Sequence, residues 1–209
     1  MTRAGVGVTP PLLAIIVPTI PGRESLLSRC LWSITEQLTD DVHVLVVQGT
    51  GKLGDKANLA ASITDAEYMT VVDDDDYLDG AYLSLTLPEL SVDYVGFKVV
   101  QWIDNTLHAI GSTRGDRPGF AKRGNNHGPC PKGITRTALW RDVPFGNSYH
   151  ADRTWSAEIA ARITSHTFVN RALYIYDHQP AASAFLGGGF RDVGVWPYDA
   201  ERVEFITLD

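Results

Sequence analysis

The sequence predicts an α/β protein, a single domain whose mainly parallel central sheet is flanked by helices. Short apolar runs at residues 12–17, 42–47 and 68–72 have the composition of buried strands. Segments with apolar side chains at helical spacing lie between them, and strands that alternate with helices are typical of parallel sheets. The chain has 209 residues, of which 44% are apolar and 21% charged, as expected of one globular domain with a sizeable core.

The elements expected in the first half follow one another closely. The run LLAIIV at residues 12–17 is bounded by prolines, as a buried strand should be, and PTIPGRE is the loop after it. Residues 24–37 carry apolar side chains on one helical face. Residues 42–47 form the second strand, the glycine-rich turn GTGKLG follows, and a helix over 55–65 leads to the third strand at 68–72.

The second half is less regular, and its expected elements are a helix at 79–90, a strand at 92–103, a long loop at 113–133, helices at 135–142 and 152–164, and a strand at 167–177. Loops of this length are usually functional or disordered. The tail adds a glycine-rich loop, LGGGF, which is either a lid over bound donor or an ordinary loop. We expect one domain, with a nucleotide-binding half at about 12–105 and an acceptor-side half with the tail at about 106–209.

Four consecutive aspartates, Asp73 to Asp76, end the third strand in EYMTVVDDDDYLDG. Ligands of parallel α/β sheets bind at the carboxyl ends of the strands, which places these carboxylates beside a binding site. In strand geometry Asp73 and Asp75 point to one side, and Asp74 and Asp76 to the other. Such a pair suits a hard divalent cation that relieves their mutual repulsion. The alternative is a helix N-terminus, where Asp76 or Asp79 caps the helix.

Other ligand-binding motifs fit this region less well. Counted from Asp73 or Asp75, the run lacks the glutamate at the twelfth position that an EF-hand loop needs. The turn GTGKLG matches the G-x-G-x-x-G motif of dinucleotide-binding proteins, but it follows the second strand, whereas that motif usually follows the first. An NAD site is therefore the weaker interpretation, and a P-loop is excluded because no Ser or Thr follows the terminal lysine.

The net charge of −7 is unevenly distributed along the chain. Residues 111–141 contain seven bases and one acid, a net charge of +6, which leaves −13 for the rest. This asymmetry indicates an anionic partner, or else a solvated loop that balances an acidic body. The candidates for contact with an anionic acceptor are Arg117, Lys122, Arg123 and His127, the last of which could equally be an exposed loop histidine.

Neither a membrane helix nor an export signal is evident in the sequence. No apolar stretch reaches the ~20 residues of a membrane helix, and MTRAGVGVTPPLL lacks a signal-peptide core with a cleavage site. We expect a cytoplasmic protein without membrane insertion, in the host cytoplasm if a phage encodes it. The two cysteines, Cys30 and Cys130, are too few for a disulfide framework or a zinc site, which fits that location. The oligomeric state is not indicated.

Two longer motifs narrow the choice of family. IIVPTIPGRE is a first strand that ends in Pro-Thr before an arginine-containing loop, and DKANLAASITDAEYMTVVDDDDYL joins a helix carrying Lys56 and Asn58 to a strand ending in Asp-x-Asp-Asp. Together they resemble the GT-A fold glycosyltransferases, above all the large inverting family that includes bacterial polysaccharide and cellulose synthases. The resemblance covers residues 12–80 well. It is weaker over 130–180, where PKGITRTALWRDVPFGNSYHADRTW resembles the acceptor-side segment.

The resemblance implies a donor site at these strand ends. Thr19 and Arg23 would lie beside the nucleotide. Asp73 would face its ribose or the metal, and Asp75 would bind the cation that bridges the diphosphate. The family usually has an acid at the end of the second strand to contact the nucleobase, whereas this chain has Gln48. The full set of donor-binding residues implied is Pro18, Thr19, Arg23, Gln48, Lys56, Asn58, Asp73 and Asp74.

The same resemblance implies a catalytic base in the second half. The family's base is often in a Glu-Asp pair, and here His150-Ala151-Asp152 assigns that role to Asp152, although Ala151 replaces the first acid. A strand-end histidine often completes the metal site, and YIYDHQ offers His178. Simpler interpretations are that Asp152 caps its helix and that His178 is a satisfied strand-end residue. Trp155 is either an acceptor-binding, sugar-stacking platform or a core residue.

The expected function is therefore that of a metal-dependent, inverting glycosyltransferase that uses Mn²⁺ or Mg²⁺ and a nucleotide-sugar donor, with a UDP-sugar expected. The +6 stretch suggests a polyanionic acceptor such as a hydroxymethylated base in DNA, as in phage-type DNA glycosyltransferases. Oligosaccharide, lipid-phosphate and protein acceptors stay open. The competing class is a non-catalytic nucleotide- or sugar-binding module, which the retention of Asp73, Asp75 and Asp152 argues against.

Overall fold

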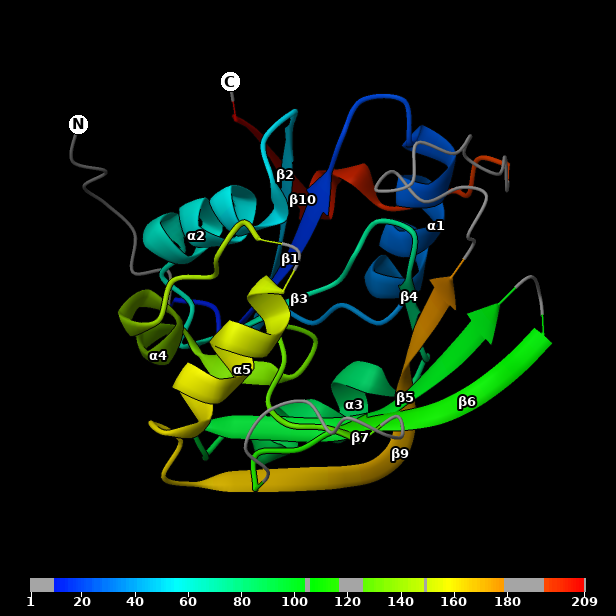
Figure 1. The fold of residues 1–209 in the computed structure, drawn as a ribbon. Helices are drawn as coiled ribbons and strands as arrows, with labels where there is room; N and C mark the ends of the chain where they lie inside the picture. Colours follow the sequence, from blue (N-terminus) through cyan, green and yellow to red (C-terminus); the bar gives the residue numbers. More distant parts are fainter. Residues whose placement is uncertain (1–9, 104–105, 117–125, 149, 179–193, 209) are drawn as a thin grey trace.

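The computed structural model describes residues 10–103, 106–116, 126–148, 150–178 and 194–208, which form one curled sheet with helices packed on it (Figure 1). The helices are α1 (Glu24–Thr35), α2 (Leu53–Ile63), α3 (Tyr82–Thr86), α4 (Thr137–Asp142) and α5 (Ala151–Ala160), with short 3₁₀ helices at Leu87–Glu89 and Ala200–Arg202. Within these described ranges, no helix has the length and apolar character needed to cross a membrane.

The sheet draws strands from the whole length of the chain. Its strands are β1 (Leu13–Thr19), β2 (Val42–Gly49), β3 (Tyr68–Val71), β4 (Tyr77–Leu78), β5 (Tyr94–Ile103), β6 (Thr106–Thr113), β7 (Asn126–His127), β8 (Ile134–Arg136), β9 (His166–His178) and β10 (Val203–Leu208). Their main order is β10-β2-β1-β3-β8-β5-β6-β7, with β9 paired to β5 and β4 paired to β9. The two halves expected from the sequence are thus interleaved in one sheet, and their separate roles stay a prediction.

The first half of the chain confirms the predicted β-α-β-α-β order. Strands β2, β1 and β3 are parallel, and β10 extends this parallel set beside β2. Alternate residues of β1 serve different faces: Leu13, Ile15 and Val17 pack with α1, while Ala14 and Ile16 pack with α2, α4 and α5. A strand that is buried on both faces has to be apolar throughout, which explains why this run shows no alternation.

The second half differs from the prediction in several places. Strand β5 pairs antiparallel with β6 and β8 and parallel with β9, so this part of the sheet is mixed. The helix expected at 79–90 is divided into α3 and a 3₁₀ helix, because Pro88 cannot continue the α-helical hydrogen-bond pattern. The loop expected at 113–133 contains β7, and β4, β6, β8 and β10 were not predicted at all. The LGGGF loop lies outside the described residues.

Close backbone approach explains why GTGKLG is rich in glycine. A Cβ on Gly49 would lie 2.1 Å from the carbonyl oxygen of Leu208 in β10. A Cβ on Gly54 would lie 2.4 Å from the Asn147 side chain and 2.6 Å from the Phe145 carbonyl oxygen. The turn therefore needs glycine so that β10 and the segment before α5 can pack against it, a reason that does not involve a dinucleotide.

Candidate active site

The aspartate run lies in a tight turn between β3 and β4, at the carboxyl end of the parallel strands (Figure 1). The Asp76 N–H donates to the Asp73 carbonyl at 2.9 Å, so the run is a turn and does not extend the strand. The expected alternation nevertheless holds for burial. The side chains of Asp73 and Asp75 are 31% and 36% exposed, whereas those of Asp74 and Asp76 are 3% and 1% exposed.

Thr19 and Arg23 hold the first buried carboxylate. Thr19 Oγ1 donates to Asp74 Oδ2 at 2.6 Å, and Arg23 Nη1 lies 3.1 Å from Asp74 Oδ1. Arg23 Nη2 also contacts Asp75 Oδ2 at 2.5 Å, so one guanidinium binds two neighbouring aspartates. Burial raises the pKa of Asp74 to about 7, against the opposing effects of Arg23 and Thr19. The loop after β1 is thereby fixed to the aspartate run.

Lys132 joins the other two aspartates. Its Nζ contacts Asp73 Oδ2 at 2.5 Å, Asp76 Oδ2 at 2.8 Å and the Tyr174 hydroxyl at 2.7 Å, which engages all three of its N–H groups. The Tyr174 hydroxyl donates to Asp76 Oδ2 at 2.5 Å, and the Asp177 N–H donates to Asp76 Oδ1 at 2.9 Å. Burial raises the pKa of Asp76 to about 7, against the effect of Lys132. Burial also acts to lower the pKa of Lys132, but Asp73 and Asp76 outweigh it and hold that pKa well above its usual value.

Sequence reasoning identified the aspartates but missed the groups that neutralise them. Lys132 counted only as one charge in a basic stretch, and Arg29 only as part of a helix. In α1, Arg29 Nη1 contacts Asp177 Oδ2 at 2.6 Å, and Arg29 Nη2 donates to the Asp75 carbonyl at 2.5 Å. The position of Arg29 next to the buried Cys30, at the edge of the apolar helix face, is the signal that could have indicated a buried ion pair.

A cavity of about 1210 Å³ opens beside this network. Asp73 lines it from the turn after β3, Lys132 from the segment before β8 and Tyr176 from β9, and Asp152 lines it from α5. The remaining walls come from the turn before α2 and its first residues, from β5 and β6, and from the segment that leads into α5. Asp73, predicted to bind the donor, and Asp152, predicted to be the base, therefore line the same cavity. Its wall carries these two carboxylates and the ammonium group of Lys132.

Asp152 stands in the first turn of α5, half-buried in the wall of this cavity. The N-cap position belongs to His150, and Asp152 Oδ1 accepts a hydrogen bond from the adjacent Arg153 N–H at 2.8 Å. The interpretation of Asp152 as the N-cap residue is therefore wrong. Because the residue lies inside the first turn, the positive end of the helix dipole stabilises its negative charge. The structure therefore places the Asp152 carboxylate in the cavity wall, and its role as the base stays a prediction.

Two of the residues predicted to bind the donor, Lys56 and Asn58, form hydrogen bonds within the protein, and a third, Pro18, lies in β1. Lys56 is 2% exposed, and its Nζ donates to the Thr19 carbonyl at 2.5 Å. The Asn58 amide makes two hydrogen bonds with the Phe145 backbone, at 2.9 and 2.8 Å. Pro18 lies in β1 after the pairing with β3 has ended, so its missing N–H costs no bond to that strand. These residues shape the walls of the site, and their direct contact with a donor stays a prediction.

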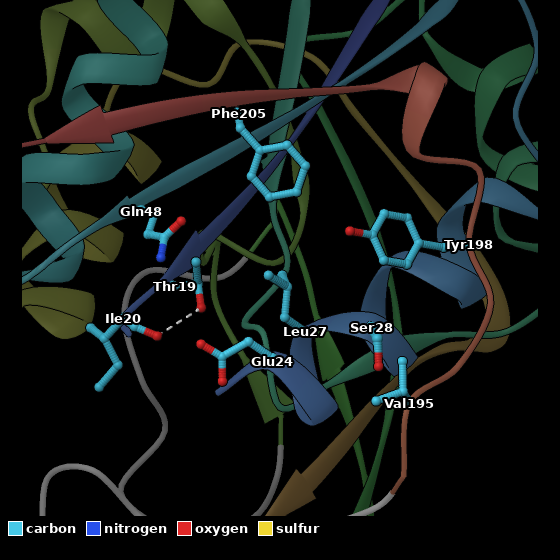
Figure 2. Close-up of a pocket in the computed structure, with 9 residues that line it drawn as sticks. All are labelled: Thr19, Ile20, Glu24, Leu27, Ser28, Gln48, Val195, Tyr198 and Phe205. Atoms are coloured by element: carbon cyan, nitrogen blue, oxygen red, sulfur yellow. Dashed lines mark hydrogen bonds between the residues drawn. The ribbon is translucent and has the colours of Figure 1, made fainter. Parts of the chain in front are cut away.

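A second cavity, of about 250 Å³, adjoins the same strand ends (Figure 2). Thr19 and Gln48 line it from the carboxyl ends of β1 and β2, where the two residues are paired in register. Tyr198 and Phe205, from the end of the chain, line the far side. Thr19 therefore lines this cavity and also donates a hydrogen bond to Asp74. Gln48 lies in the cavity wall, and its contact with a nucleobase stays a prediction.

The structure gives little support to the predicted acceptor-binding residues, because one is buried and the side chains of the others lie outside the described residues. Trp155 is 1% exposed, its ring lies 4.6 Å from that of Trp140, and its Nε1 donates to the Val143 carbonyl at 2.9 Å. The structure thus supports the core interpretation of Trp155 and not the sugar-stacking one. The backbones of His127 and His178 end β7 and β9, but the described residues do not include their side chains. The predicted acceptor residues that lie wholly outside the described ranges are Arg117, Lys122 and Arg123.

The described bases of the stretch at 111–141 have partners within the protein. Arg114 Nε lies 2.9 Å from Asp116 Oδ1, and Lys132 binds the aspartate run. The other described bases of the stretch, which contact carboxylates or backbone carbonyls, are Arg136 and Arg141. The charge asymmetry is therefore a weaker indication of an anionic acceptor than the sequence suggested, and it now depends on the three bases outside the described ranges.

The two outward carboxylates fit a divalent cation. Asp73 and Asp75 each use Oδ2 to contact a basic residue, and among the described residues neither Oδ1 has a hydrogen bond or ion pair. Mg²⁺ usually binds one or two protein carboxylates and completes its shell with substrate phosphate and water, and Mn²⁺ also favours oxygen ligands. The described part of the chain contains no group of three His, Cys, Asp or Glu side chains that could hold a metal ion. Asp73 and Asp75 are thus two carboxylates that could hold a cation, and metal binding stays a prediction.

Comparisons with known proteins identify the fold. Neither a scan against protein-family models nor a search of curated proteins gave a match. The crystal structure of S. aureus TarS 1-349 has a TM-score of 0.61 at 19% identity, covering 79% of this chain and 60% of that one. The complex of TarS 1-349 with UDP-GlcNAc has a TM-score of 0.61 at 18% identity, covering 79% and 58%. The mannosyltransferase PcManGT from Pyrobaculum calidifontis, in complex with GDP-Man and Mn2+, has a TM-score of 0.53 at 15% identity, covering 79% and 56%.

This chain spans about three fifths of the length of these structures. At such low identity the likeness to these structures defines the fold of this chain and nothing more. The chain has the α/β fold of the GT-A glycosyltransferases in a single domain.

Proposed function

We propose that the protein is a metal-dependent, inverting glycosyltransferase that uses a nucleotide-sugar donor. The observation that carries this proposal is that Asp73, which follows the parallel strand β3, and Asp152 line one cavity. The similar structures include complexes with UDP-GlcNAc and with GDP-Man and Mn2+, which supports a nucleotide-sugar donor. A UDP-sugar is the donor that we expect here.

The geometry suits a single displacement at the sugar. The acceptor oxygen forms a bond to the anomeric carbon while the bond from that carbon to the diphosphate oxygen breaks, and the nucleoside diphosphate leaves. Asp152 takes the proton of the acceptor hydroxyl as attack occurs, which general-base catalysis requires. Inversion at the anomeric carbon follows from one displacement, because no covalent glycosyl-enzyme intermediate is formed.

The leaving diphosphate carries growing negative charge. Asp73 and Asp75 would hold Mn²⁺ or Mg²⁺, with His178 as a third predicted ligand, and the cation supplies positive charge for that diphosphate. Arg23 and Lys132 contact the Oδ2 atoms of these aspartates and so fix the position of both carboxylates. The chain thus pre-orders the acidic ligands before a donor arrives.

A donor-turnover assay separates this proposal from a non-catalytic binding module. The protein is incubated with UDP-GlcNAc, UDP-glucose or GDP-mannose in the presence of Mn²⁺, and the release of nucleoside diphosphate is measured. We expect release that is proportional to protein concentration and is abolished by EDTA. Saturable binding of the same donors without any release, with or without acceptors, would favour the binding module.

Replacing Asp75 by alanine should remove the metal-dependent part of nucleotide binding while the fold survives. Arg23 retains its contact with Asp74, and the loss of one acid from a crowded run relieves repulsion. Calorimetry with UDP at fixed Mn²⁺ is expected to show the affinity of the variant reduced to that of the wild type in EDTA. Asp65→Ala, which changes an exposed aspartate before β3, is the matched control. Wild-type affinity in Asp75→Ala would contradict the assignment of Asp75 as a metal ligand.

The acceptor class is the finer part of the proposal, and a hydroxymethylated base in DNA is the candidate that the sequence suggested. Its support is now confined to Arg117, Lys122 and Arg123, since the described bases of the stretch have internal partners. An oligosaccharide or lipid-phosphate acceptor is the alternative. The cavity beside Asp152 carries Lys52 as well as Lys132, which is compatible with either a phosphorylated or a neutral acceptor.

If DNA is the acceptor, its binding should weaken steeply as salt rises, because each phosphate contact releases counterions. The triple change of Arg117, Lys122 and Arg123 to alanine should then reduce the slope of log K against log salt by about 2 to 3 units. The measurement is fluorescence anisotropy of duplex and single-stranded DNA at several salt concentrations. A variant without Arg162 and Arg171, two exposed bases elsewhere, is the control. Absence of binding at low salt, or an unchanged slope in the triple variant, would exclude DNA.

A further inference from the structure

The smaller cavity has a wall that comes from the C-terminal end of the chain. Figure 2 shows Phe205 of β10 and Tyr198 of the preceding segment facing Thr19, Gln48 and Leu27 across the opening. Phe205 is 48% exposed, so about half of a large aromatic side chain is open to solvent at the rim of the cavity. An exposed aromatic beside a cavity at the ends of parallel strands is a place where a ligand can be bound.

The C-terminal wall is firmly attached to the rest of the domain. The rings of Trp196 and Trp32 of α1 are 4.8 Å apart, and the Trp196 N–H donates to Ser28 Oγ at 3.1 Å. The whole of β10 pairs in parallel with β2, from Val203 opposite Val44 to Leu208 opposite Gly49. The backbone on either side of Tyr198 and at Phe205 is therefore held in place, and a bound group would not have to order this segment at the cost of affinity.

The chemistry of the lining points to an uncharged, planar group. Among the described residues that line the cavity, the charged side chain is the carboxylate of Glu24, which would repel a phosphate. The volume of about 250 Å³ is below the ~300–1,000 Å³ typical of pockets that enclose a whole drug-sized ligand, so it suits one ring system. Aromatic faces favour stacking with such a ring, and the Gln48 amide can both donate to and accept from its polar edge.

The residues next to this cavity include the aspartates that are proposed to bind the cation at the diphosphate of the donor. Thr19 lines the cavity and also donates to Asp74 at 2.6 Å, and Asp74 directly precedes the proposed metal ligand Asp75. A neutral ring in the cavity would thus lie next to the place where a cation and a diphosphate are expected. We infer that the C-terminal segment completes the nucleobase subsite of the donor, with Tyr198 and Phe205 contacting the base and Gln48 selecting it. This inference rests on the proposed function and assigns the donor's base to residues from the far end of the chain.

Calorimetry in Mn²⁺ with UDP, GDP and inorganic pyrophosphate tests the inference, because pyrophosphate has no base. Phe205→Ala and Tyr198→Ala should each weaken binding of the preferred nucleotide by about 5- to 150-fold, the range of base–aromatic stacking, and leave pyrophosphate binding unchanged. Gln48→Glu, which replaces an amide by an acceptor-only group, should change the ratio of UDP to GDP affinity without removing an aromatic wall. Ile110→Ala is the matched control, since Ile110 is a 57% exposed apolar residue of β6, at the other end of the sheet.

The possible results separate the two claims. If the wild type binds a nucleotide and both aromatic variants bind it equally well, the C-terminal subsite is wrong while the glycosyltransferase proposal stands. If the wild type binds pyrophosphate but neither nucleotide, or binds nothing, the proposed function fails and the inference fails with it. Unfolding of each variant in urea is followed in parallel, and Phe205→Leu, which keeps an apolar side chain without a ring, replaces the alanine variant if that variant is unstable.

Discussion

Asp152→Asn is expected to lower the rate of sugar transfer by about 10²- to 10⁴-fold, the contribution of general acid–base catalysis, and to leave nucleotide affinity nearly unchanged. The amide keeps the size of the side chain and can still accept the hydrogen bond from the Arg153 N–H. It cannot take a proton from the acceptor. The measurement is kcat for transfer, or for donor hydrolysis if no acceptor is found, together with the Kd of UDP in Mn²⁺.

The matched control for this variant is Glu158→Gln on the same helix. Glu158 is exposed and does not line the cavity, so the control makes the same chemical change on α5 without touching the proposed site. It should show wild-type turnover. A wild-type kcat in Asp152→Asn would show that Asp152 is not the base, and His150, at the N-cap of the same helix, would be tested next.

The parts of the fold that could be predicted are those whose signal is local. The runs that became β1, β2 and β3 are buried on both faces, so every residue in them has to be apolar and the sequence shows it directly. The aspartate run was identified for the same reason, because four adjacent carboxylates after a buried strand have no simple structural explanation. Its burial alternates as expected, although the chain turns there instead of continuing as a strand.

The parts that could not be predicted depend on contacts between distant residues. Lys132 lies 59 positions after Asp73, and no periodicity in either segment indicates that the two side chains meet. Strand β10 is half-exposed at the sheet edge next to β2, so its composition carries little of the apolar signal that marks a central strand. For Trp155, the sequence was ambiguous. A tryptophan near the predicted base could pack in the core or bind a ligand, and only its burial in the structure shows that it packs in the core.

The ion pair between Lys132 and the buried Asp76 leads to the second large expected effect. Lys132→Met should lower the free energy of unfolding by about 3–5 kcal/mol, because breaking a buried pair leaves an uncompensated carboxylate. Asp76 is 1% exposed, and Lys132 is the basic side chain that contacts it within the described part of the chain. The variant should also weaken Mn²⁺-dependent nucleotide binding by about 10- to 100-fold, as expected when a residue that orients a metal ligand is removed. Urea unfolding at pH 7 and calorimetry with UDP measure the two effects.

A double variant distinguishes loss of charge neutralisation from loss of packing. Asp76→Asn removes the buried charge. Its Oδ1 can keep the hydrogen bond from the Asp177 N–H, and its NH2 group can donate to the Tyr174 hydroxyl in place of the bond that this hydroxyl gave to the carboxylate. Added to Lys132→Met, it should restore more than about 1 kcal/mol of stability, a coupling typical of residues in one ionic network. Lys52→Met, which removes an exposed lysine from the wall of the same cavity, should change stability by less than about 0.5 kcal/mol. Strictly additive effects in the double variant would mean that Lys132 stabilises the site through its aliphatic chain and not by neutralising Asp76, and the aspartate run would then need another source of compensation.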